Sequence, residues 1–285
     1  GSSRSLEQRL VKPYFNLTCM RIESVRGRGH FAWLSLPWRL FRAVVQALGI
    51  VRRVCPDVVV TFGSFVSAPV GLAAWVLKKP LVVHEQNAIA GMTNRYLARI
   101  ATYVVEAFSE SFPPTIKTYV LGNPVRQELS AVLPPAERFL ARQGPLRLLV
   151  LGGSQGARAI NASVLAWVKQ YALADEVMIW HQTGEAEKRE VASVYESQDV
   201  QARVDDFIDD MASAYVWADL VICRSGALTV SELMTVGLAS ILVPFPHAVD
   251  DHQYKNAQFL ARADAAQVVR ESDLSSSVLQ QLISP

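Results

Sequence analysis

The sequence has few of the residues that build disulfide frameworks or metal sites. Its three cysteines, Cys19, Cys55 and Cys223, match neither a metal-ligand spacing nor a paired framework. No His-Glu-x-x-His pattern occurs among the histidines, which are His30, His84, His181, His247 and His252. Adjacent aspartates diverge and are typical of caps and turns: Asp205-Asp206, Asp209-Asp210 and Asp250-Asp251. We therefore predict free thiols suited to a reducing cytoplasm, no metal and no cofactor.

Long apolar runs are also absent. No segment approaches the ~20 consecutive apolar residues that a membrane-spanning helix needs, although 51% of the residues are hydrophobic. The net charge of +2 is nearly balanced, so overall charge predicts no nucleic-acid partner. This composition is typical of a globular enzyme.

Positive charge is concentrated near the start of the chain. Residues 21–53 contain one glutamate, Glu23, and seven arginines, Arg21, Arg26, Arg28, Arg39, Arg42, Arg52 and Arg53. Interleaved with them are Phe31, Trp33, Leu34, Leu36, Trp38, Leu40 and Phe41. Arginine mixed with tryptophan and phenylalanine is expected of a surface that lies on anionic lipid. The alternative is that the aromatic residues belong to the core and the arginines are solvated.

Strands and helices are predicted to alternate along the chain. The predicted strands lie near 57–63, 81–85, 102–107, 117–121, 146–151, 176–181, 202–207, 219–223 and 240–244. The predicted helices lie near 39–53, 66–77, 92–100, 157–172, 186–197, 210–217, 228–236 and 251–262. Several strands, such as Leu148-Leu149-Val150-Leu151, are apolar without alternation, as strands covered on both faces must be. The pattern predicts an α/β protein with parallel sheets.

The chain is long enough for two domains, since one domain usually has ~100–200 residues. A strand ends at Gly122-Asn123-Pro124, and a proline-bearing segment, residues 133–145, precedes the next strand. We place the domains at 1–125 and 126–285.

One strand-to-helix junction is suited to an anion. Cys223-Arg224-Ser225-Gly226-Ala227 joins the end of an apolar strand to a helix that ends at Gly237. Small residues let the backbone approach a ligand, and the unpaired amides at the helix start favour negative charge. Glu232, farther along the helix, is an acceptor suited to two ribose hydroxyls. The alternative is an ordinary turn with Glu232 on a solvated face.

A second junction has the same character. An apolar strand leads into Gly152-Gly153-Ser154-Gln155-Gly156-Ala157. The spacing is neither the dinucleotide fingerprint nor a Walker loop, but the amides and the Ser154 hydroxyl still predict a phosphate cradle. In doubly wound folds, ligands bind at the carboxyl ends of the strands, where both junctions lie.

Six segments in order resemble the MurG family of UDP-N-acetylglucosamine transferases. They are His84-Glu85-Gln86-Asn87, Gly122-Asn123-Pro124-Val125-Arg126, residues 152–157, Phe207-Ile208-Asp209-Asp210-Met211, residues 223–232, and Asp251-His252-Gln253-Tyr254-Lys255-Asn256-Ala257. The resemblance covers nearly the whole chain. It implies a GT-B fold, two Rossmann-like domains with parallel sheets facing a cleft, with residues 1–125 on the acceptor and membrane side and residues 126–285 binding the UDP-sugar donor.

The resemblance also implies a function. MurG enzymes are hexosyltransferases that move N-acetylglucosamine from UDP-N-acetylglucosamine to the muramoyl 4-hydroxyl of undecaprenyl-linked lipid I, giving lipid II for peptidoglycan. This implies a role in bacterial cell wall biogenesis, cell shape, cell division and the cell cycle, and a peripheral location on the cytoplasmic face of the inner membrane. The implied partners are the donor, lipid I and an anionic membrane surface.

Site residues follow from the family's donor site. The backbone at Ile208 would bracket uracil and Glu232 would hold the ribose. The diphosphate would lie against Ser154, Arg126 and the helix turn Ala227, Leu228, Thr229, Val230 and Ser231. Asn87 and Gln253 would contact the sugar, because amides match hydroxyls and an acetamide as donor and acceptor.

The expected mechanism inverts the anomeric carbon. Negative charge grows on the β-phosphate as UDP leaves, and a helix N-terminus with Arg126 can stabilise it without a cation. The family's favoured general base, the histidine of an N-terminal Gly-Gly-Thr-Gly-Gly-His loop, is not in this sequence. His84 is the remaining weak candidate, so the catalytic residue is unknown.

The sequence departs from the family in three places. By comparison, the first βα unit and the last helices are missing, so we expect both domains to be incomplete and the first to have unpaired strand edges and bare apolar faces. We also expect weak donor binding and no transfer of the sugar. Phe65 stands where the family favours tyrosine, and Ser64 and Ala68 replace glycines. Two alternatives stay open: another GT-B UDP-sugar enzyme or an epimerase, and an inactive fragment that binds UDP-N-acetylglucosamine.

Overall fold

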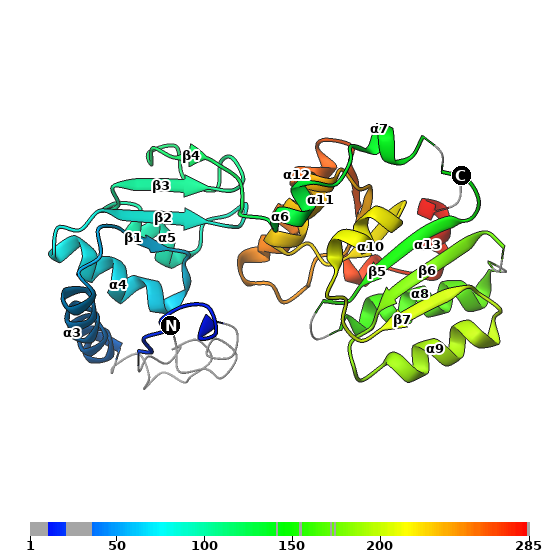
Figure 1. Cartoon of the computed structure of the whole chain (residues 1–285), viewed down its shortest axis with the longest axis horizontal. Helices are drawn as coiled ribbons and strands as arrows, with labels where there is room; N and C mark the ends of the chain where they lie inside the picture. Colours follow the sequence, from blue (N-terminus) through cyan, green and yellow to red (C-terminus); the bar gives the residue numbers. More distant parts are fainter. Residues whose placement is uncertain are drawn as a thin grey trace. The chain divides into compact units, whose positions relative to one another are not determined.

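The structure is a computed structural model that describes residues 11–20, 36–140, 142–153, 156–171, 173 and 175–283. The chain forms two compact units, Gly1–Gly122 and Asn123–Pro285 (Figure 1). The sequence-based division lies three residues later. Each unit is an α/β layer structure with its own parallel sheet, which confirms the predicted fold class.

The first unit contains a four-stranded parallel sheet in the order β1-β2-β3-β4. Its strands are β1 (Val59–Thr61), β2 (Leu81–Glu85), β3 (Tyr103–Glu106) and β4 (Tyr119–Val120). Its helices are α3 (Leu36–Val54), α4 (Ser64–Val76) and α5 (Met92–Leu97). Leu81, Val83 and Leu97 are buried in one core cluster, and helices α3 and α4 pack together around Ala47 and Ala73.

The two faces of this sheet differ in exposure. Val59 and Val83 point into the core, whereas Val60, Tyr103 and Tyr119 on the opposite face are exposed. Strand β1 is the last strand on its side of the sheet among the described residues.

The second unit contains a six-stranded parallel sheet in the order β10-β9-β8-β5-β6-β7. Its strands are β5 (Leu146–Leu151), β6 (Val177–Gln182), β7 (Ala202–Asp205), β8 (Leu220–Cys223), β9 (Ser240–Leu242) and β10 (Ala266–Val268). Leu148, Leu149 and Val150 are all fully buried, because helices cover both faces of this central strand. Sequence order reverses between β5 and β8, which makes their carboxyl ends the switch point of the sheet.

Helices of the second unit connect these strands. They are α6 (Gln127–Ser130), α7 (Pro135–Arg138), α8 (Arg158–Gln170), α9 (Lys188–Ser197), α10 (Met211–Trp217), α11 (Ala227–Val236), α12 (His252–Ala261) and α13 (Ser276–Ile283), with 3-10 turns at Val249–Asp251 and Glu271–Asp273. Trp167 and Tyr195 are among the largest buried side chains of this core. All nine predicted strands and all eight predicted helices are confirmed, and all but β2 and β5 have shifted ends.

Four elements of this unit were not predicted: α6, α7, β10 and α13. The first two have four residues each and β10 has three, too few for a periodic pattern. Helix α13 packs on α8, where Gln280 accepts a hydrogen bond from Trp167 Nε1 at 2.7 Å. This contact is nonlocal, so the local sequence does not reveal it.

Candidate functional site

The glycine-rich turn after β5 needs glycine at two positions for steric reasons. A Cβ on Gly152 would lie 2.7 Å from the Ala157 amide nitrogen, and one on Gly156 would lie 2.6 Å from the Thr183 carbonyl oxygen. Gly156 also has a φ of +75°, which side chains rarely adopt. The turn is thus pressed against the end of β6. Ser154, the predicted phosphate donor, lies outside the described residues.

The turn after β8 leads directly into α11. Gly226 is the N-cap residue, and α11 ends at Gly237 in the left-handed conformation with a φ of +61°, as a C-terminal glycine commonly does. Asn256 Nδ2 donates to the Ser225 carbonyl at 3.2 Å and ties the turn to α12. The first amides of α11 therefore start at the carboxyl end of β8, as the sequence predicts.

A cavity of ≈ 170 Å³ opens at the switch point of this sheet. Its floor includes Leu151 at the end of β5, Gln182 at the end of β6 and Cys223 at the end of β8. The other lining residues are Arg126, Gly153, Phe207, Ile208, Met211, Tyr215, Arg224, Thr229 and Glu232. The two predicted junctions thus open into one cavity, where this fold class binds ligands.

Glu232 is the carboxylate of this cavity. Tyr215 Oη donates to its Oε2 at 3.0 Å, and Arg126 Nε lies 3.6 Å from its Oε1. Arg126 also reaches the carbonyl oxygen of Asp209 at 3.5 Å. Both oxygens of the carboxylate are therefore oriented by neighbours from other elements, which leaves acceptor positions toward the cavity.

Burial and the charge of this carboxylate shift the pKa values of two neighbouring side chains, Cys223 and Tyr215. Burial, reinforced by the charge of Glu232, raises the pKa of Cys223 to about 12. The same two causes raise the pKa of Tyr215 well above its usual value. Both groups stay protonated at neutral pH, so Tyr215 is a permanent hydrogen-bond donor.

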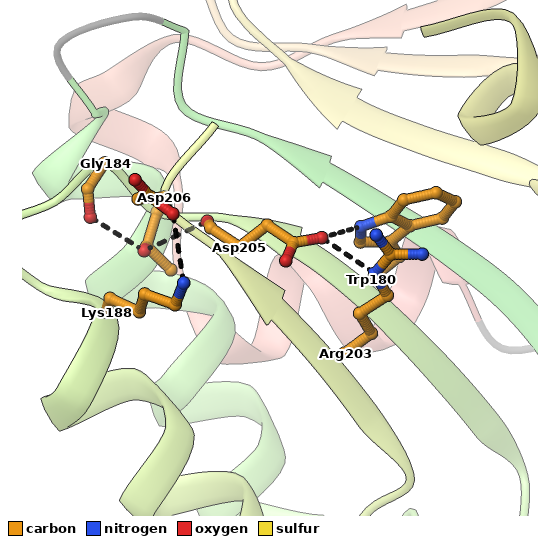
Figure 2. Close-up of polar contacts among 7 residues, drawn as sticks. Trp180, Gly184, Lys188, Arg203, Asp205 and Asp206 are labelled. Carbon is orange, nitrogen blue, oxygen red and sulfur yellow. Dashed lines mark hydrogen bonds and ion pairs between the residues drawn. The ribbon is translucent and has the colours of Figure 1, made fainter. Parts of the chain in front are cut away.

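Polar contacts fix the edge strand β7 (Figure 2). Trp180 Nε1 and Arg203 Nε both donate to Asp205 Oδ2 at 2.8 Å, and the Arg203 guanidinium lies 4.0 Å from the Trp180 ring centroid. Lys188 Nζ donates to Asp206 Oδ1 at 3.0 Å. These contacts hold the end of β7, from which the chain continues to Phe207 and Ile208 in the cavity wall.

Only some of the adjacent aspartates act as the sequence predicts, and the others form ion pairs. Asp210 caps α10 by accepting a hydrogen bond from the Ser213 amide at 3.0 Å. Asp251 pairs with Arg270 at 3.0 Å. The cysteines Cys19, Cys55 and Cys223 are free thiols. Within the described ranges, no group of three or more potential metal ligands occurs.

The remaining described residues of the predicted site in the second unit do not line the cavity. Ala227 and Leu228 begin α11, and Val230 is fully buried behind them. Ser231 accepts from Asn123 Nδ2 at 2.9 Å. Gln253 on α12 accepts a hydrogen bond from the Phe245 amide at 2.9 Å.

In the first unit, Asn87 lies in the loop after β2. The buried carboxylate of Glu85 accepts hydrogen bonds from the backbone and side-chain nitrogens of Asn87, from the Gly91 amide and from Asn94 Nδ2 at 2.8–3.2 Å. A carboxylate has about four acceptor positions, so these donors satisfy it without a cation. Glu85 therefore orders the loop that presents Asn87.

His84 ties the end of β2 to the end of the first unit. Its Nε2 lies 3.0 Å from the Gly122 carbonyl oxygen, which can only accept, so Nε2 carries the proton. Its Nδ1 is buried without a partner among the described residues. This arrangement favours a structural role over that of a general base.

Several cavity residues are not among the site residues predicted from the sequence, chiefly Tyr215, Gln182, Met211 and Arg224. Arg224 donates to the carbonyls of Val243 and Pro244 and pairs with Glu271. Its position next to Ser225, in the junction predicted to bind an anion, was the sequence signal that could have identified it. Tyr215 had none, because it occupies an apolar helical stretch and reaches Glu232 only through tertiary packing.

Two family models match the chain. The glycosyltransferase family 28 N-terminal domain matches residues 1–106 and the family 28 C-terminal domain matches residues 147–285. The chain is also similar, over nearly its whole length, to proteins named UDP-N-acetylglucosamine--N-acetylmuramyl-(pentapeptide) pyrophosphoryl-undecaprenol N-acetylglucosamine transferase. The Coxiella burnetii protein is 48% identical over 99% of this chain and 78% of its own length, and the Marinobacter nauticus protein is 47% identical over the same shares.

Solved structures agree with these matches. The crystal structure of Acinetobacter baumannii MurG has a TM-score of 0.85 and 36% identity, covering 99% of this chain and 80% of that one. A UDP-GlcNAc 2-epimerase from Neisseria meningitidis has a TM-score of 0.55 at 14% identity, covering 86% and 73%, which reflects the shared fold alone. The chain therefore belongs to glycosyltransferase family 28 and, within it, to the MurG family.

Proposed function

We propose that this protein is an inverting hexosyltransferase that moves N-acetylglucosamine from UDP-N-acetylglucosamine to the muramoyl 4-hydroxyl of lipid I, giving lipid II for peptidoglycan and the cell wall. The observation that carries the proposal is the cavity at the switch point of the second unit. There a glycine-rich turn, a helix start and a carboxylate converge. The UDP part of the donor has groups that match this cavity: an anionic diphosphate, a ribose diol and the amide edge of uracil.

The donor nucleotide fits the cavity wall in three parts. The backbone at Ile208 brackets uracil, and Glu232 accepts from the ribose hydroxyls. Arg126, Thr229 and the amides that begin α11 face the diphosphate. Gln253 contacts the sugar. The support is that Arg126, Ile208, Thr229 and Glu232 line one cavity.

Leaving-group stabilisation is the catalytic task that these residues can perform. Negative charge develops on the β-phosphate as the glycosidic bond breaks. The N-terminal amides of α11 belong to the fold before the reaction, so they stabilise that charge without reorganising, and the guanidinium of Arg126 adds positive charge. The acceptor proton passes to a general base that remains unassigned.

We further propose that α3 contacts an anionic membrane, on the cytoplasmic face of the bacterial inner membrane. Trp38 and Phe41 are 63% and 58% exposed, and their rings stack at 5.7 Å between centroids. Arg42, Arg52 and Arg53 on the same helix are exposed. The exposure of Trp38 and Phe41 does not fit the alternative that these two side chains belong to the core. Phe31 and Trp33 lie outside the described residues. No helix among the described residues is long and apolar enough to cross a membrane.

The test measures binding and transfer separately. Calorimetric titration with UDP-N-acetylglucosamine should give saturable binding, with ADP as the control nucleotide. Incubation with a lipid I analogue should then give the disaccharide product, unchanged by EDTA. Absence of UDP-sugar binding would contradict the donor site. Release of free UDP and an isomerised sugar without acceptor would indicate an epimerase, and binding without transfer would favour the inactive-fragment alternative.

A further inference from the structure

Tyr215 is a buried hydroxyl that points at the functional carboxylate. It is 1% exposed, lies on α10 and lines the cavity. Its Oη donates to Glu232 Oε2 at 3.0 Å. Glu232 comes from another helix, α11, and its side chain keeps 13% exposure. The hydroxyl thus reaches the carboxylate from the protein side.

Arg126 competes for the same carboxylate. Its Nε lies 3.6 Å from Glu232 Oε1, which is longer than a charge-assisted hydrogen bond of about 2.7–2.9 Å. If the Glu232 side chain were free to rotate, it would close this gap. Glu232 and Arg126 would then form a direct ion pair. The Tyr215 hydrogen bond opposes that movement, because it fixes Oε2 and so sets the plane of the carboxylate.

We propose that Tyr215 is a positioning residue that holds the Glu232 carboxylate in the plane that accepts both ribose hydroxyls of a uridine nucleotide. The inference rests on the proposed donor site and adds a specificity element to it. A diol needs two acceptor positions on one carboxylate edge, so orientation matters as much as charge. Because the Tyr215 hydroxyl does not ionise near neutral pH, this positioning is constant over the physiological range.

The experiment compares UDP with 2′-deoxy-UDP by calorimetry. Tyr215→Phe removes one oxygen and keeps the packed ring. We expect a loss of roughly ten-fold in affinity for UDP, the size of one hydrogen bond to a charged group, and a loss below about two-fold for 2′-deoxy-UDP. A merely structural role would lower both affinities by the same factor, which would overturn the proposal.

Tyr195→Phe is the matched control. Tyr195 is 2% exposed and its hydroxyl bonds to His181 at 2.7 Å, and it does not line the cavity. This variant should leave the ratio of the two affinities unchanged. The ratio is independent of the folded fraction of a sample, because calorimetry reports that fraction as stoichiometry.

The coupling to Glu232 is tested in a double variant. In a Glu232→Ala background, Tyr215→Phe should not change the affinity for UDP further. A further loss there would mean that Tyr215 acts by another route and would overturn the proposal. If the unaltered protein did not bind UDP, the donor site itself would fail; if it bound UDP and Tyr215→Phe kept the same ratio, only the role of Tyr215 would fail.

Discussion

The amide oxygen of Asn161 lies 3.0 Å from Nε2 of His181, in a region of the second unit that solvent does not reach. The oxygen only accepts, so Nε2 is the protonated nitrogen, and Nδ1 accepts from Tyr195 Oη at 2.7 Å. Asn161 Nδ2 in turn donates to Glu187 Oε2 at 2.6 Å. Both ring nitrogens of the neutral imidazole therefore have a hydrogen-bond partner.

Because His181 is neutral in the folded protein, we expect the second unit to lose stability in acid. Burial lowers the pKa of His181 to about 3, whereas an unfolded histidine titrates near 6.5. Between these values the unfolded chain binds more protons, so the free energy of unfolding falls as pH falls. We expect a loss of about 2 kcal/mol between pH 6.5 and pH 5.

Hydrogen exchange of the β5 and β6 amides measures this loss. His181→Gln removes the titrating group and retains a donor and an acceptor, so its stability should depend less on pH over the same interval. Equal acid sensitivity of both proteins would assign the effect to another group.

Glu232→Ala should weaken UDP-N-acetylglucosamine binding by roughly 1–3 kcal/mol, because hydrogen bonds from the ribose to a charged group are lost. Calorimetric titration measures the change, and thermal unfolding checks that the variant is folded. Glu196→Ala, an exposed position on α9, should bind normally. Unchanged affinity in a folded Glu232→Ala protein would remove this residue from the site.

Gly156→Ala and Gly144→Ala separate steric contact from backbone strain. Both glycines have positive φ, +75° and +93°, but only the Cβ at 156 would meet another atom closely, at 2.6 Å. Gly144→Ala should cost about 1 kcal/mol of stability. Gly156→Ala should cost about 1–3 kcal/mol more and weaken UDP binding, because the turn must shift. Urea denaturation with calorimetry tests both points, and equal costs would contradict the close packing of the turn.

Helix α3 should bring the protein to anionic vesicles in a salt-dependent manner. Charge attraction at an exposed surface is screened within ~8–10 Å near physiological salt, so sedimentation with anionic vesicles should decline as salt rises. Replacing Arg39 and Arg42 by Gln should reduce binding. The same charge change at Arg189 and Arg262, exposed residues of the second unit, should have little effect. Equal binding to neutral and anionic vesicles would argue against the electrostatic contribution.

Much of the fold followed from local pattern. The strand at Leu148-Leu149-Val150 was predictable because a strand covered on both faces must be apolar throughout. Gly152 and Gly156 marked a turn because few other residues tolerate such contacts. By contrast, β10 and α13 were missed, since a strand of three residues carries no periodicity and α13 is held by its packing on α8.

The candidate site was predictable only in part. Arg126, Ile208 and Glu232 belong to motifs readable along the chain, and they line one cavity. Tyr215 was not predictable, because its apolar surroundings are those of any buried aromatic residue. The role of Glu85 was also hidden: its four hydrogen bonds depend on how the loop after β2 folds back.

The sequence by itself determined the alternation of strands and helices, the two small-residue turns and the family, because these depend on residues adjacent in the chain. Only the tertiary structure decided which strands became neighbours. Strand β8 pairs with β5 across about seventy intervening residues, in register from Leu148 opposite Leu220 to Leu151 opposite Cys223. That pairing joins the two turns into one cavity and brings Tyr215 to Glu232, because long-range register is set by packing of the whole core and not by any local preference.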